Sequence, residues 1–254
     1  MRNFLAVLKL AKVAAHLLVG LLTICFHFPK LTQTQKNKRI EVWASELLAK
    51  LAIKLIVAGK PPVNGPVLLV SNHISWLDIL VIHAGGHCRF VSKSDIKHWP
   101  VIGTLTTAAG TLYIERESRR DAMRVVHHMS EALAAGDIVA VFPEGTTGNG
   151  IDLLPFHANL LQAAIAVDVP VQPIALSFID AATGQISQAA SFVGDETLLG
   201  SLWNTLKSCN LTAVATYGVP QSAQGRDRRV WAADLRTEIA LLKSIAPSTS
   251  PSKL

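Results

Sequence analysis

The feature that most limits the fold of this chain is an alternation that begins after the helix-breaking stretch Gly59-Lys60-Pro61-Pro62. From there, short apolar runs of strand length alternate with longer stretches of helical periodicity. Strands are predicted at residues 67–70, 88–91, 111–114, 138–142, 171–177 and 211–217, and helices at 76–84, 118–135, 157–167, 198–208 and 228–245. This pattern predicts an α/β fold in which a mixed central sheet is layered by helices.

The first 28 residues are strongly apolar and predict a membrane-associated segment. Basic residues lie on both sides of the run, with Lys9 and Lys12 before its longest apolar part and Lys30 after it. A single span usually carries its positive excess on one side only, so this distribution favours a segment that enters and returns, or one that lies in the interface. A secretory signal is disfavoured, because no small-residue cleavage site follows the run.

Residues 39–58 are predicted to continue this region as a second helix. An apolar stripe at helical spacing includes Ile40, Trp43, Leu47, Leu51 and Leu55, with basic residues beside it, which is typical of an interfacial helix. The alternative is an amphipathic helix packed on the domain core. We therefore divide the chain into membrane-associated helices (1–58), an α/β domain (59–246) and a disordered tail (247–254). The final Ser-Lys-Leu is a weak match to a peroxisomal address.

The composition favours lipid as the partner of this chain. Half of the residues are hydrophobic and 17% are charged, against about 25% charged in soluble domains. The net charge of +6 suits an anionic membrane surface, an anionic substrate or nucleic acid, but no basic tract of nucleic-acid type is present. Cys25, Cys88 and Cys209 are scattered without metal-ligand spacing, so we expect neither a disulfide framework nor a metal site.

The strongest chemical motif is Asn72-His73-Ile74-Ser75-Trp76-Leu77-Asp78, which follows an apolar strand. His73 and Asp78 are five residues apart and would not face each other on one helix. Across a strand-to-helix turn, with Ser75 as a helix cap, they can meet. Asp78 would then accept from one imidazole nitrogen and leave the other as a general base. The alternative is a histidine that only satisfies an aspartate at a helix start.

Two further segments combine strands with polar groups. The strand at 138–142 runs into Pro143-Glu144-Gly145-Thr146-Thr147-Gly148, a loop in which glycines permit close backbone approach and successive N–H groups can hold an anion. The alternative is a plain turn. Arg116 follows the strand at 111–114 and offers a fork of donors suited to phosphate, although a surface arginine would give the same pattern.

Together with the proline-containing strand at 169–175, these blocks occur in an order that resembles the glycerolipid acyltransferase family, the lysophosphatidic acid acyltransferases and their relatives. The resemblance covers roughly residues 60 to 220 and identifies the His-x-x-x-x-Asp motif and the Phe-Pro-Glu-Gly-Thr motif in this chain. It implies that His73 and Asp78 are catalytic. The residues that it implies in substrate binding are Asn72, Arg116, Glu144, Gly145, Thr146 and Thr147.

The resemblance implies transfer of an acyl chain from acyl-CoA or acyl carrier protein to the free hydroxyl of a lysolipid. No metal or redox cofactor is expected. The expected location is the cytoplasmic face of the inner (plasma) membrane, on an anionic bilayer surface. The primary acceptor is 1-acylglycerol-3-phosphate, which would give phosphatidic acid.

The sequence departs from the family pattern at two places. Thr147 stands where an arginine is common. After Phe156, where the family usually has a basic residue and then a glycine two positions further on, this chain has His157, Ala158 and Asn159. Lyso-ornithine lipid or another lysophospholipid therefore remains an alternative acceptor. Two rivals belong to other classes: a lipid hydrolase, disfavoured because no G-x-S-x-G motif is present, and a non-catalytic, basic membrane-binding protein.

Overall fold

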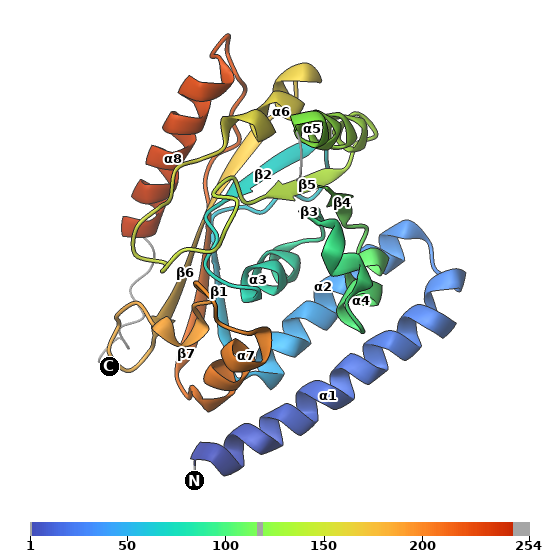
Figure 1. Cartoon of the computed structure of the whole chain (residues 1–254), viewed down its shortest axis with the longest axis vertical. Helices are drawn as coiled ribbons and strands as arrows, with labels where there is room; N and C mark the ends of the chain where they lie inside the picture. The colour runs from blue at the N-terminus through green and yellow to red at the C-terminus, as the bar shows by residue number, and fades with distance from the viewer. Residues whose placement is uncertain (1, 116–118, 246–254) are drawn as a thin grey trace.

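A sheet of seven strands organises the part of the chain that the computed structural model describes, residues 2–115 and 119–245 (Figure 1). The strands are β1 (Lys54–Ala58), β2 (Val67–Ser71), β3 (Arg89–Lys93), β4 (Leu112–Ile114), β5 (Ile138–Val141), β6 (Val171–Asp180) and β7 (Leu211–Tyr217), in the order β1-β7-β6-β2-β5-β3-β4. Neighbouring strands from β6 to β4 are parallel, and β7 pairs antiparallel with β6. The predicted mixed α/β fold is confirmed.

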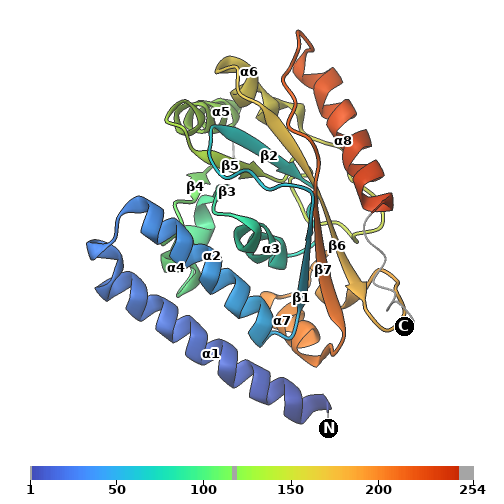
Figure 2. The ribbon, with the colours of Figure 1, turned by 180° about the vertical axis from the view of Figure 1, so that it is seen from behind.

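Helices cover both faces of this sheet (Figures 1 and 2). The α-helices are α1 (Arg2–Phe26), α2 (Gln33–Lys50), α3 (Leu77–Gly85), α4 (Ile102–Ala108), α5 (Arg119–Ala134), α6 (Gln162–Ala166), α7 (Leu198–Lys207) and α8 (Arg228–Ser244). Short 3₁₀ segments occur at Phe28–Lys30, Ser94–His98, Ala158–Leu161 and Gln188–Ala190.

Strand β2 shows why the sheet needs cover on both sides. Val67 and Leu69 belong to a core shared with α2, α3 and α7, whereas Leu68 and Val70 belong to a core shared with α5, α6 and α8. Successive strand side chains point to opposite faces, so an unbroken apolar run is the expected pattern of a strand buried on both. The carboxyl ends of parallel strands meet at one edge of such a sheet, where ligands bind in open α/β folds.

The prediction of a single interfacial helix over residues 39–58 is wrong. Helix α2 ends at Lys50, Ala52 has a positive φ of 60°, and strand β1 then pairs parallel with β7. Ile40, Leu47 and Leu51 of the apolar stripe are buried, so the stripe packs on the domain core instead of a bilayer. The β-branched residues Ile53, Ile56 and Val57 were the overlooked sign of a strand.

Helix α1 is the element that leaves apolar surface uncovered. It is the outermost helix in both ribbon views and packs along α2 and α7 (Figure 2). Only a narrow stripe of Ala6, Val13, His16 and Gly20 is buried. The exposed apolar side chains include Phe4, Leu5, Val7, Leu8, Leu10, Leu18, Val19, Leu22 and Phe26. By length and composition α1 could cross a membrane. The predicted tail at 247–254 lies outside the described residues.

Candidate active site

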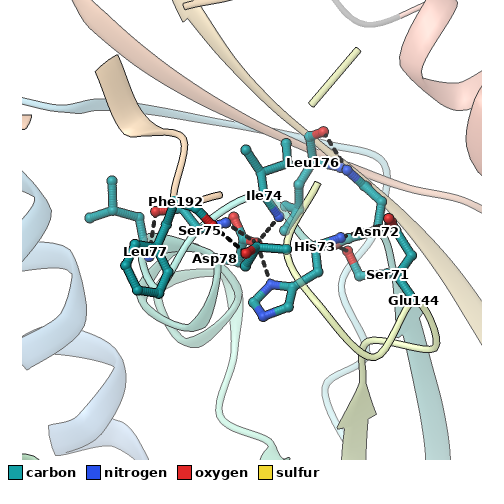
Figure 3. Close-up of polar contacts among 11 residues, drawn as sticks. Ser71, Asn72, His73, Ile74, Ser75, Leu77, Asp78, Glu144, Leu176 and Phe192 are labelled. Carbon is teal, nitrogen blue, oxygen red and sulfur yellow. Dashed lines mark hydrogen bonds and ion pairs between the residues drawn. The ribbon is translucent and has the colours of Figure 1, made fainter. Parts of the chain in front are cut away.

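The turn between β2 and α3 brings the predicted catalytic pair together. Nδ1 of His73 lies 2.8 Å from Oδ2 of Asp78 (Figure 3). The Asp78 side chain is fully buried, and the His73 side chain retains 20% exposure. The two residues therefore meet across the strand-to-helix turn, as the sequence predicts, and the imidazole remains within reach of a substrate.

Backbone donors orient the Asp78 carboxylate. Its Oδ2 atom also accepts from the N–H groups of Ile74 at 2.6 Å and Ser75 at 2.9 Å, at the start of α3. Ser75 supports this helix start, because its Oγ accepts from Leu77 N–H at 3.3 Å. These two backbone donors fix the position of the Asp78 carboxylate beside His73. With the proton of His73 on Nδ1, facing Asp78, Nε2 carries the lone pair that a general base needs.

Phe142 supports the imidazole from its face. The rings of His73 and Phe142 stack with centroids 4.0 Å apart and an interplanar angle of 9°, and Phe142 in turn stacks on Phe90 at 5.7 Å. Phe142 belongs to the Phe-Pro-Glu-Gly-Thr motif, but the sequence did not indicate this contact. A flat aromatic support restricts rotation of the histidine ring and is favourable for an imidazolium, as in other cation–π contacts.

Glu144 holds the backbone of His73. Its Oε1 accepts from His73 N–H at 3.0 Å, and its Oε2 accepts from Leu154 N–H at 3.2 Å. On the other side, the His73 carbonyl accepts from Gly148 N–H at 2.7 Å. Burial raises the pKa of Glu144, whereas the hydrogen bonds from His73 and Leu154 lower it. Each carboxylate oxygen of Glu144 thus has a backbone donor, an arrangement suited to positioning His73.

Asn72 ties the same turn to the neighbouring strand. Its amide donates to the Leu176 carbonyl at 3.1 Å and accepts from Leu176 N–H at 2.8 Å. The side chain is buried. Asn72 therefore links the end of β2 to the middle of β6, directly beside His73. Its predicted contact with substrate stays a prediction.

Thr147 joins the loop after β5 to the segment after β6. Its Oγ1 donates to the Phe192 carbonyl, and Phe192 N–H donates to the Ile74 carbonyl at 3.1 Å. Residues around 192 therefore lie beside the catalytic turn (Figure 3). Thr146 is exposed in this loop. Gly145 has a φ of 72°, and a Cβ there would lie 3.0 Å from the ring of His157, so a larger residue would be strained and crowded.

Helix α8 contributes two basic residues that the sequence did not single out. Arg236 donates to the carbonyls of Leu153 at 2.5 Å and Leu154 at 3.0 Å. Lys243 donates to the carbonyls of Gly150 at 2.8 Å and Ile151 at 2.9 Å. Both cations hold the stretch that carries the Leu154 donor to Glu144. Their spacing of seven residues, two helical turns, was the available sign that they share a face.

The cation that the sequence predicted for the site, Arg116, lies outside the described residues. Strand β4 ends at Ile114, and its carboxyl end shares the sheet edge of β2, because the strands from β4 to β2 are parallel. The prediction that Arg116 binds the acceptor's phosphate remains a prediction.

Known proteins are similar to this chain over most of its length. A family model described as Acyltransferase matches residues 39–177. The chain is 36% identical to a lyso-ornithine lipid O-acyltransferase of Pseudomonas aeruginosa over 208 aligned residues. The alignment covers 81% of this chain and 79% of that protein. It is 37% identical over 196 residues to a 1-acyl-sn-glycerol-3-phosphate acyltransferase of Neisseria gonorrhoeae, which covers 76% of each.

A solved structure shares the fold. The 1-acyl-sn-glycerophosphate acyltransferase of Thermotoga maritima superposes with a TM-score of 0.70 at 17% identity, over 96% of this chain and 98% of that one. Two levels of similarity therefore converge, sequence identity over most of the chain and a common fold over nearly all of it. The chain belongs to the acyltransferase family.

Proposed function

We propose that this enzyme transfers an acyl chain from a thioester donor to the free hydroxyl of a lysolipid, with His73 as the general base. The observation that carries the proposal is the 2.8 Å contact between His73 Nδ1 and Asp78 Oδ2, in a chain of the acyltransferase family. The pair leaves Nε2 to take a proton, and a base so placed is worth about 10²–10⁴ in rate.

In the proposed reaction, Nε2 of His73 removes the acceptor's hydroxyl proton as that oxygen attacks the thioester carbonyl carbon. The carbonyl π electrons move onto oxygen and form a tetrahedral oxyanion. When the carbonyl re-forms, the C–S bond breaks, and the imidazolium returns its proton to the leaving thiolate. The products are an ester and a free thiol. Asp78 stabilises the imidazolium between the two proton transfers.

The chemistry of the donor follows from this scheme. Acyl-CoA and acyl carrier protein both present an acyl thioester, and either would react in the same way. The loop residues Gly145, Thr146 and Thr147 remain the predicted contacts for substrate, beside a base whose backbone Glu144 holds.

The acceptor has two candidates. The primary one is 1-acylglycerol-3-phosphate, supported by the relatives of Neisseria and by Arg116 as a predicted phosphate ligand. Lyso-ornithine lipid is favoured by two observations: Thr147 replaces an arginine that is common in the family, and the relatives of Pseudomonas and of Brucella abortus are named for that lipid. A phosphate monoester carries a charge between about −1.5 and −2 near neutral pH, so a missing arginine matters more for the first candidate.

We propose that α1 holds the enzyme in one leaflet, on the cytoplasmic face. The helix packs along α2 and α7, so it could not cross the bilayer without pulling the folded domain with it. Its outward side chains are apolar, and basic residues lie near both of its ends. Such a helix lies in the interface with its apolar face in the acyl region.

A radiolabelled thioester assay tests the reaction and the acceptor together. Purified enzyme is given labelled acyl-CoA or acyl carrier protein with lysophosphatidate, lyso-ornithine lipid or neutral lysophospholipid. We expect labelled diacyl lipid from one of the anionic or zwitterionic acceptors, and none from His73→Ala. Labelled free fatty acid without diacyl product would identify a hydrolase. No turnover of any donor and acceptor would favour a non-catalytic membrane protein.

A further inference from the structure

A basic cavity lies where three helix ends meet, in a region that the proposed reaction does not use. It has a volume of about 400 Å³ and is bounded by the first turns of α1, the end of α2 and the end of α7. The cations in its lining are Arg2, Lys9, Lys12, Lys50 and Lys207. The rest of the lining is apolar or uncharged, and no carboxylate is part of it among the described residues.

The charges of this cavity are incompletely balanced. Glu46 is 3.6 Å from Lys50, but it is half-exposed and outside the lining. Lys9 donates to the Ser208 carbonyl at 2.7 Å, which neutralises no charge. Lys50 and Lys207 occupy the last turns of α2 and α7, where a helix end favours a cation.

The cations of α1 have no such explanation. The first turn of α1 contains Arg2 and no acidic residue, although the positive end of a helix disfavours a cation. Lys9 and Lys12 follow within three turns and face the same cavity. Several like charges around a small volume repel one another, and an anion in that volume would remove the repulsion.

Apolar surface continues directly from these cations. Leu5 and Leu8 line the cavity and are 43% and 45% exposed. Further along α1, large exposed apolar side chains extend the same surface. A ligand that satisfies both parts has an anionic head and an apolar tail.

We propose that this cavity binds the phosphate of an anionic phospholipid, with its acyl chains lying along the exposed face of α1. The inference rests on the proposed placement of α1 in one leaflet and adds a second lipid site, separate from the catalytic turn. Charge complementarity selects the occupant: an anionic phospholipid in the bilayer supplies the missing charge and the apolar chains together. The site would fix where the N-terminal end of α1 sits on an anionic leaflet.

The chain carries its own reporter for this site. Cys209 lines the cavity and is exposed, whereas Cys88 is buried. With Cys25 replaced by serine, alkylation by the neutral reagent iodoacetamide reports Cys209. The probes are dihexanoyl phosphatidylglycerol and dihexanoyl phosphatidylcholine, each below its micelle concentration. Phosphatidylglycerol should slow alkylation roughly tenfold at ten times its Kd, because about one cavity in eleven is then free, and phosphatidylcholine should have little effect.

Variants separate a built site from general surface charge. The double variant Lys12→Gln/Lys207→Gln should lose the protection of Cys209 by phosphatidylglycerol. Thermal melting checks that this variant still folds. Lys36→Gln combined with Lys38→Gln, near the opposite end of α2, is the matched control and should leave protection intact. Equal protection by both lipids, by inorganic phosphate at the same concentration, or in the Lys12/Lys207 variant would overturn the proposal.

The proposed lipid site and the proposed reaction can be disproved independently of each other. His73→Ala should keep full protection of Cys209 while losing acyl transfer. The Lys12/Lys207 variant should keep its rate on short-chain soluble substrates while losing protection. Loss of that soluble rate in a folded Lys12/Lys207 variant would place these lysines in the reaction and overturn the assignment of a separate lipid site.

Discussion

Replacing Glu144 with glutamine tests whether this residue positions the base or binds the acceptor. Glutamine has the same shape, but it offers one acceptor oxygen where the carboxylate offers two. In the wild type, Oε1 accepts from His73 N–H at 3.0 Å and Oε2 accepts from Leu154 N–H at 3.2 Å. In the variant, the amide nitrogen must face one of these two donors, and that N–H loses its partner.

The magnitude follows from the two hydrogen bonds. A hydrogen bond to a charged group contributes about 1.5–3 kcal/mol, and a buried donor left without a partner costs about 1–3 kcal/mol. Each 1.36 kcal/mol added to the barrier is tenfold in rate. If the lost partner is that of His73, kcat should fall roughly tenfold to a hundredfold. Because the substrate keeps its own contacts, the acceptor's KM should change little.

The assay measures kcat and the acceptor's KM separately, with thermal melting to confirm the fold. Glu196→Gln is a matched control, because Glu196 accepts from Asn204 on the exposed surface and should leave both constants unchanged. Arg236→Gln should lower kcat in the same direction by a smaller factor, since Arg236 acts through Leu153 and Leu154. A folded Glu144→Gln enzyme with unchanged kcat and a greatly raised acceptor KM would refute the positioning argument.

Other predictions test the base, the anchor, the buried thiol and the head group. His73→Ala should remove acyl transfer with little change in Tm, because the ring is at the surface of the site. Turnover close to that of the wild type would disprove the proposed mechanism. Deleting residues 1–31 should release folded enzyme from membranes into the soluble fraction, whereas deleting residues 1–58 should unfold the enzyme, because α2 and β1 are then missing. If the enzyme without residues 1–31 still sediments with membranes and is not aggregated, another part of the chain binds the membrane. Burial raises the pKa of the Cys88 thiol, so it should resist alkylation in the native enzyme and react only on unfolding, as mass spectrometry would show. Arg116→Ala should lower kcat/KM for lysophosphatidate roughly tenfold to a hundredfold, which is the loss expected when one hydrogen bond to a charged group is removed. Unchanged kinetics on every acceptor would disprove the prediction that Arg116 binds the acceptor's phosphate.

The sequence predicted the sheet better than the N-terminal helices, for physical reasons. Strands such as β2 and β7 are buried on both faces, so their apolar runs are continuous and easily distinguished. Residues 51–58 combine helical spacing with β-branched side chains, and the local pattern alone does not decide between helix and strand. Tertiary pairing with β7 decides it. Helix α4 was not predicted, because it is short and follows Val101, whose φ of 65° no sequence rule anticipates.

The contact between His73 and Asp78 was predicted from the sequence, but the contacts that hold this pair in place were not. The sequence placed His73 and Asp78 together from the strand-to-helix turn alone. The contacts of Asn72 with Leu176, and of Arg236 with the loop at 153–154, span 104, 83 and 82 residues of sequence. A short linear motif does not predict such contacts, because only the pairing of strands in the sheet and the packing of α8 bring these groups together.

Thr147 shows how this support bears on specificity. Its hydroxyl donates to the Phe192 carbonyl, and Phe192 N–H donates to Ile74 beside the base. An arginine at this position is longer and has no hydroxyl, so it could not keep this tether in the same place. The residue that departs from the family pattern therefore has a structural role here, in joining the loop after β5 to the segment after β6. Other residues must then recognise the charge of the head group. A lysolipid with a smaller net negative charge than a phosphate monoester would need fewer basic residues for its recognition. On this reasoning, Thr147→Arg should loosen the segment at 192 and shift the ratio of kcat/KM towards lysophosphatidate over lyso-ornithine lipid, whereas Thr147→Ser should keep the tether and the wild-type ratio. An unchanged ratio in Thr147→Arg, with the enzyme folded, would show that residue 147 does not set the acceptor.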